Sequence, residues 1–135
     1  MRKAITVLSE EFQIVVSADG GLVRLTVGGP YSRAHLTRLL HRIVTETAAH
    51  GIPRALVDAR SVALNLSTIA RYEIGVQIAD AIGRGIRVAM LLVPAVVDRF
   101  AETVARNRGA TVRVFTDEAA ALQWLGQGGA PAPDV

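Results

Sequence analysis

Residues 54–71 read RALVDARSVALNLSTIAR, and this stretch contains the strand-to-helix junction that decides the fold. Its first part, residues 54–59, is a short aliphatic run that predicts a buried strand. Ser67 follows after a loop and is a good N-cap, so a helix is expected from Ser67 to about Ile82. Ser67 and Thr68 thus have one of two roles. They either only cap the start of a helix, or they also form a reactive site there.

The same alternation of strand and helix extends on both sides of this junction. Strands are expected at 12–17, 22–27, 54–59, 86–93 and 111–115, and helices at 33–49, 67–82, 95–107 and 118–125. Asp19-Gly20-Gly21 predicts a hairpin turn, which places the first strand antiparallel at one edge. The later strands alternate strictly with helices and should be parallel. We therefore expect an α/β fold with a mixed, mostly parallel five-stranded sheet and four helices.

Length and composition support a single domain with an aliphatic core. The chain has 135 residues, of which 50% are hydrophobic but only 4% aromatic. Branched aliphatic residues suit parallel strands that are buried on both faces. We expect an N-terminal segment at 1–11, the domain at 12–125 and a disordered Gly/Pro-rich tail at 126–135.

Several classes of protein are disfavoured by the composition. The absence of cysteine removes disulfides, thiolate zinc sites and cysteine nucleophiles. The net charge of +3 comes from scattered residues, whereas nucleic-acid binding needs a clustered basic face. The longest apolar run, 88–97, is too short to span a membrane and contains Pro94, which we place in the first turn of the third helix. A cytoplasmic protein without membrane insertion is expected.

The polar residues form no recognisable catalytic or metal-binding set. His35 and His41 lie about 240° apart around the first helix, so neither pairs with the other as a metal ligand. Asp58 occupies the place of the phospho-acceptor in response-regulator receivers, but the acidic pair and the lysine of that chemistry are missing. We expect Asp58 to accept backbone N–H bonds, and we expect no catalytic residue, metal or cofactor.

The helix at 67–82 carries two apolar stripes. The first stripe consists of Ala70, Ile74, Ile78, Ala81 and Ile82, and the second of Ile69, Tyr72, Val76, Ala79 and Gly83. One stripe must cover the sheet, and the other needs a neighbouring helix, a second subunit or an apolar ligand. The second stripe is therefore a candidate partner or ligand surface.

Two motifs give the chain a family resemblance. The pattern ALVDARSVALNLSTIA…GRGIRVAMLLVPAVVDRF…TVRVFTDEAAALQWL resembles STAS domains, the family of bacterial anti-sigma factor antagonists such as SpoIIAA and of sulfate-transporter tails. The resemblance spans about residues 12–125 and is nearest to bacterial STAS-like proteins with V-R-V-F-T-D-x-x-x-A-x-x-W-L, as in Val112 to Leu125. It implies a SpoIIAA-like β/α superhelix with a mixed sheet.

In the antagonists, a D-S-S/T-G sequence at the start of the second helix carries the serine that a partner kinase phosphorylates. The resemblance puts Ser67 and Thr68 at that place, as candidate phospho-acceptors, but Leu66 and Ile69 replace the flanking Asp and Gly. We therefore interpret Ser67 as an N-cap first. We expect a non-enzymatic regulatory interaction module that forms a homodimer through this helix. The alternatives are a carrier of a small apolar ligand or lipid, and a phospho-regulated antagonist.

Overall fold

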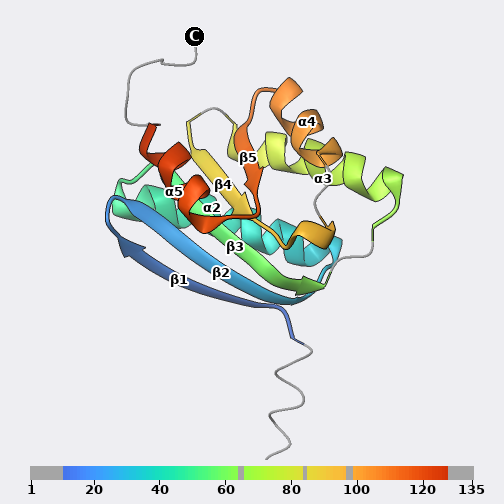
Figure 1. Cartoon of the computed structure of the whole chain (residues 1–135), viewed down its shortest axis with the longest axis horizontal. Helices are drawn as coiled ribbons and strands as arrows, with labels where there is room; N and C mark the ends of the chain where they lie inside the picture. Colours follow the sequence, from blue (N-terminus) through green and yellow to red (C-terminus); the bar gives the residue numbers. More distant parts are fainter. Residues whose placement is uncertain (1–10, 64–65, 84, 97–98, 128–135) are drawn as a thin grey trace, which may run out of the picture.

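The computed structural model describes residues 11–63, 66–83, 85–96 and 99–127. Its elements follow the predicted order (Figure 1). They are β1 (Gln13–Asp19), β2 (Leu22–Pro30), α2 (Arg33–His50), β3 (Arg54–Ala63), α3 (Thr68–Ile82), β4 (Arg87–Leu91), the 3₁₀ turn η1 (Pro94–Val96), α4 (Phe100–Asn107), β5 (Thr111–Phe115) and α5 (Glu118–Gln127).

The five strands form one sheet in the order β1-β2-β3-β4-β5. β1 is antiparallel to β2, and the other three strand pairs are parallel. The turn between β1 and β2 uses Gly20 and Gly21 at φ +64° and +81°, where side-chain-bearing residues are strained. The predicted hairpin, the edge position of the first strand and the mixed, mostly parallel sheet are confirmed.

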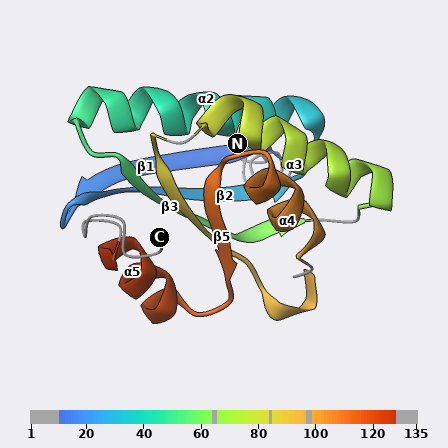
Figure 2. The same ribbon diagram turned by 90° about the horizontal axis from the view of Figure 1, so that it is seen from above.

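The two faces of the sheet are covered unequally. α2, α3 and α4 lie over one face, whereas α5 alone lies over the other (Figure 2). The main core is aliphatic and fills the space between the sheet and the three helices. A second, smaller core lies under α5 and is formed by Leu56, Ala89, Ala121 and Leu125. The aliphatic composition thus supplies both cores.

Two strands are longer than the sequence indicated. β2 continues through Gly28 and Gly29 to Pro30, and β3 continues to Ala63, because Gly28–Pro30 pair with Ser61–Ala63 beyond a register shift. The expected end of this strand at residue 27 was therefore wrong. Gly29 has φ +102°, and a Cβ at this position would overlap the backbone of Glu11. Its glycine therefore serves a close backbone approach inside the ladder rather than a strand end.

The helix expected at 95–107 was also wrong in its first part. Pro94–Val96 form a 3₁₀ turn in which Val96 N donates to Val93 O at 3.1 Å, and the α-helix begins only at Phe100. At the other end of the chain, α5 continues to Gln127, two residues into the segment expected as a tail. The rest of that segment, 128–135, and most of the expected N-terminal segment, 1–10, lie outside the described residues.

Candidate functional site at the start of α3

Ser67 is the N-cap of α3. Its backbone is extended, and its Oγ accepts a hydrogen bond from the backbone N–H of Ala70 at 3.1 Å. The carbonyl of Ser67 accepts the N–H of Arg71 at 3.0 Å and so begins the helical ladder. The capping interpretation is confirmed. Ser67 and Thr68 are both exposed, so the helix start is open to a partner.

The second apolar stripe of α3 is divided by the tertiary structure. Ile69 is 71% exposed and Tyr72 is 47% exposed, whereas Val76 is half-buried and Ala79 is buried. The first stripe faces the core through Ile74, Ile78 and Ile82, although Ala81, which we placed with them, is exposed. The sequence therefore marks both apolar faces of α3 but does not show how far a neighbour covers each.

That neighbour is α4, which packs closely against α3 at Gly75. A Cβ at Gly75 would lie 2.6 Å from both the carbonyl oxygen of Ala101 and the Cβ of Val104. Tyr72 lies about 60° around the helix from Gly75 and so flanks this contact. Phe100, the residue before Ala101, is 41% exposed. We call Ile69, Tyr72 and Phe100 the α3–α4 patch.

The sequence analysis did not identify Phe100 as a surface residue. The expected helix at 95–107 placed Phe100 in its interior rather than at its start. The structure instead makes it the first residue of α4. Phe100 could have been identified only if the start of α4 had been placed correctly.

Asp58 belongs to β3 and lies on the other face of the sheet, near the start of α5. It pairs in register with Thr26 and Leu91 on the face that α5 covers. Its Oδ1 accepts the backbone N–H of Arg60 at 3.2 Å, and its carboxylate also accepts Nε and Nη2 of Arg60 at 2.9 and 2.7 Å. Asp58 therefore does not meet Ser67, whose helix lies on the opposite face of the sheet.

Arg60 connects Asp58 to a wider charge network. The Arg60 Nη2 lies 3.5 Å from Oε1 of Glu118, and Oε2 of Glu118 pairs with Arg24. The hydrogen bond from the Arg60 side chain is the main reason why the pKa of Asp58 is lowered, against the opposing effect of burial. This network fixes the first turn of α5 on the sheet.

A buried carboxylate that the sequence analysis missed protects the edge of the sheet. Glu102 of α4 is 3% exposed at its side chain, and its Oε2 accepts the backbone N–H of Val114 at 2.8 Å. Arg99 Nη1 donates to Oε1 of Glu102 and to the carbonyl of Val114, both at 2.9 Å. Because β5 is an edge strand, these bonds occupy backbone groups that another strand would otherwise pair with.

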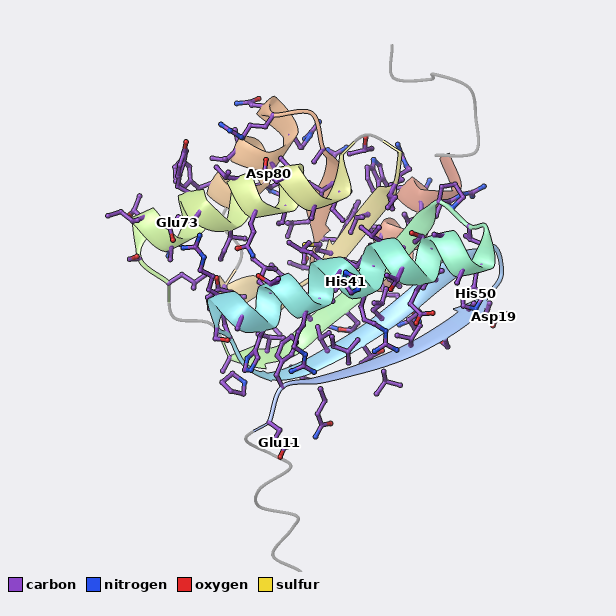
Figure 3. The ribbon with its side chains drawn as sticks, turned by 180° about the vertical axis from the view of Figure 1, so that it is seen from behind. Glu11, Asp19, His41, His50, Glu73 and Asp80 are labelled. Atoms are coloured by element: carbon purple, nitrogen blue, oxygen red, sulfur yellow. The ribbon has the colours of Figure 1, made fainter. Side chains whose placement is uncertain are left out.

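Two of the three histidines, His35 and His50, have local partners. His35 stacks on Phe12 with ring centroids 4.5 Å apart, and its Nδ1 lies 2.8 Å from the carbonyl oxygen of Pro30. The Nδ1 of His50 lies 3.0 Å from the carbonyl oxygen of Glu46. Figure 3 shows His41 separately on α2. Among the described residues, no three histidine or carboxylate side chains come together as a metal site.

Comparison with solved structures identifies the architecture. An anti-sigma factor antagonist from Mycobacterium paratuberculosis superposes with a TM-score of 0.59 at 13% sequence identity, over 86% of this chain and 95% of that one. This chain has a SpoIIAA-like fold. The predicted STAS-type architecture is thus confirmed, and at this identity the likeness shows the fold alone.

A second structure with the SpoIIAA-like fold is more distant. It is an uncharacterized protein from Shewanella loihica PV-4, with a TM-score of 0.45 and 19% identity over 84% of this chain and 93% of that one. No protein-family profile and no curated protein matches the sequence. In the part of the chain that the structure describes, no helix combines the length and apolar character needed to cross a membrane.

Proposed function

We propose that this protein is a non-enzymatic regulatory interaction module that docks through the α3–α4 patch, first of all onto a second copy of itself. The observation that carries the proposal is the exposure of Ile69, Tyr72 and Phe100. They are three of the five large hydrophobic side chains that are exposed in the described residues. Grouped apolar side chains on a surface mark sites of protein–protein contact.

The polar residues support a binding role over a catalytic one. The Oγ of Ser67 is engaged in capping α3, and the carboxylate of Asp58 is held by Arg60 on the far face of the sheet. A nucleophile needs a general base within hydrogen-bond reach, and these two groups do not provide that arrangement. The antagonist with the same fold also supports a role in regulation by protein contact.

A second copy is the partner that we favour because the patch consists of large hydrophobic side chains. A two-fold axis brings the same patch of two subunits together, and an apolar surface is complementary to itself. Burying Ile69 and Tyr72 in this way removes their exposed area from water, at about 25 cal/mol per Å² of apolar surface. Such a dimer leaves the opposite face, with α5, free.

The oligomeric state of variants tests this proposal. Light scattering over a range of protein concentrations should show a dimer for the wild type and a monomer for Ile69→Asp, because a charge at the centre of the interface must be desolvated. Val15→Asp is the matched control, since Val15 is 63% exposed on β1 and lies outside the patch. A wild type that stays monomeric would contradict self-association. Equal effects of Ile69→Asp and Val15→Asp on the oligomeric state would contradict the α3–α4 patch as its interface.

As a second function, we propose that phosphorylation of Ser67 or Thr68 controls docking through the α3–α4 patch. Both residues are exposed and directly precede Ile69. A phosphate at a helix N-terminus meets the positive end of the helix dipole and adds about two negative charges beside the apolar patch.

Intact-mass analysis of the protein from resting and stressed cells tests this second function. We expect an added phosphate in one state, and we expect Thr68→Glu to weaken self-association. Thr45→Glu, which changes an exposed threonine of α2, is the control and should have no effect. Finding no phosphate in either state, together with unchanged association of Thr68→Glu, would count against the switch.

A further inference from the structure

An apolar cavity of about 120 Å³ lies between the sheet and the layer of α2, α3 and α4. It is near the carboxyl ends of the parallel strands, where Ala59 of β3 and Met90 of β4 line its floor. Leu39 of α2 and Ile74 and Ile78 of α3 line its roof. Well-packed cores contain few voids larger than a water molecule. A space of this size is therefore a candidate binding site.

The lining excludes water and charged groups as the preferred occupant. A buried water needs two to four polar partners, whereas the wall of this cavity is mostly apolar. Glu102 touches the cavity, but its carboxylate oxygens are bound to Arg99 and to Val114 N. Arg71, the other charged residue of the wall, also has a partner already. The walls therefore favour an uncharged apolar molecule.

The size of the cavity sets the size of that molecule. A cavity of about 150 Å³ lined by Leu, Ile and Phe stays dry and binds benzene. The present cavity is slightly smaller and similarly lined. A single aromatic ring or a short branched hydrocarbon chain matches this space, whereas the acyl chain of a membrane lipid is too large for it.

The seam between α2 and α3 is held by polar side chains. It is bridged near the surface by two polar contacts, Arg33 Nη1 to Glu73 Oε1 at 3.5 Å and Gln77 Nε2 to Thr37 Oγ1 at 2.7 Å. Figure 3 shows Glu73 on α3, beside the start of α2. Exposed polar contacts of this kind contribute little stability and can open readily. The seam between α3 and α4, in contrast, is closed by backbone contact at Gly75.

Tyr31 lies at the boundary between this bridge and the cavity. Its side chain lines the cavity, and burial is the main reason why the pKa of its hydroxyl is raised. The charges of Arg33 and Glu73 act on that pKa in opposite directions. Tyr31 is therefore a half-buried residue of the cavity wall, two positions before Arg33.

We propose that this cavity binds a small uncharged apolar molecule, of about the size of one aromatic ring. The site uses Ile74 and Ile78, on the first apolar stripe of α3. The ligand surface expected from the sequence was the second stripe, so the position of this site differs from that expectation. It is also separate from the α3–α4 patch, and the proposal goes beyond the docking function.

Toluene is a suitable ligand for testing the site in the full-length protein. In an NMR titration, we expect saturable shifts of the methyl signals of Ala59, Ile74 and Ile78, while those of Val15 do not move. Ala59→Leu fills the cavity from the strand side and should abolish the saturable shifts without lowering the melting temperature. Ala48→Leu adds the same atoms at an exposed position of α2 and should bind toluene as the wild type does.

Two further variants keep the test decisive. Ile74→Phe fills the cavity from the helix side and should also abolish binding, which covers the case that Ala59→Leu does not fold. Ile69→Asp, which disrupts the α3–α4 patch, should bind toluene like the wild type, so failure of the dimer leaves this test unaffected. Absence of saturable shifts in the folded wild type, or unchanged toluene affinity in a folded cavity-filling variant, would overturn the proposal.

Discussion

Asp58 and Arg60 show how one residue pair connects a strand to a distant helix. The Asp58 side chain is 14% exposed and lies within reach of two arginines, Arg60 and Arg24. Arg60 continues to Glu118 at the start of α5, so a carboxylate on β3 takes part in positioning a helix 60 residues later. The sequence indicates a structural role for Asp58, but it does not identify these partners.

The lowered pKa of Asp58 predicts how its contribution to stability depends on pH. The folded state holds the carboxylate ionised, so its stabilising effect is complete above the ordinary Asp pKa of about 3.9. It is lost as the pH falls through the lower pKa of the folded state. Asp58→Asn should therefore reduce the free energy of unfolding at pH 7, and its difference from the wild type should shrink below about pH 4.

Urea unfolding at several pH values, followed by the fluorescence of Trp124, measures this difference. A double-mutant cycle with Arg60→Gln provides the control. In the Arg60→Gln background the ion pair with Asp58 is already absent, so Asp58→Asn should lower the free energy of unfolding by less. A constant difference between Asp58→Asn and the wild type from pH 7 to pH 3 would show that Arg60 does not hold the carboxylate ionised.

At the scale of elements, the packing of α3 on α4 depends on Gly75. Glycine inside a helix normally costs about 0.5–1 kcal/mol relative to alanine. Here the absence of a side chain lets the Ala101 carbonyl and the Val104 side chain approach the α3 backbone. On the same helix, Ala79 is buried whereas Ile69 and Tyr72 stay exposed.

Gly75→Ala should therefore destabilise the protein despite the better helix propensity of alanine. Its Cβ would lie 2.6 Å from a backbone carbonyl that cannot rotate away, so α4 must shift, at a cost of about 1–3 kcal/mol. Gly126→Ala in α5 is the matched control, since no atom lies within 4 Å of the added Cβ. The control should be neutral or stabilising in urea unfolding; equal effects of the two variants would contradict the close α3–α4 contact.

At the scale of the whole molecule, the two faces of the sheet differ in how much covers them. Three helices enclose the main core, whereas α5 alone covers the smaller one. α5 is held there by Leu125, which is 1% exposed, and by Trp124, whose ring lies under the guanidinium of Arg87 at 3.8 Å. The smaller core thus depends on few side chains.

Leu125→Ala should accordingly cost about 2–5 kcal/mol of the free energy of unfolding, as is usual when a buried leucine is truncated. Leu122→Ala, on the same helix but 37% exposed, should cost clearly less. Urea unfolding followed by both circular dichroism and Trp124 fluorescence measures the two costs. If both variants lose the same stability, Leu125 does not anchor α5 in the way the structure indicates.

Most of the fold could be predicted from the sequence because its signals are local. The glycine-rich turn after Asp19 and the Ser67 cap each act over a few residues, and both are confirmed. The errors occurred where distant contacts extend or interrupt an element. Gly28–Pro30 stay in β2 because Ser61–Ala63 lie beside them, and the start of α4 shifted from the expected position to Phe100.

The site was less predictable than the fold, and the reason is physical. Helical periodicity determined that α3 has two apolar faces, and the N-cap signal of Ser67 placed Ser67 and Thr68 at the start of the helix. Only the tertiary structure decided that Ala79 is buried whereas Ile69 and Tyr72 stay exposed. It alone also formed the apolar cavity, because an internal volume depends on how side chains from several elements meet. A periodic pattern records which faces avoid water, whereas packing decides what each face touches.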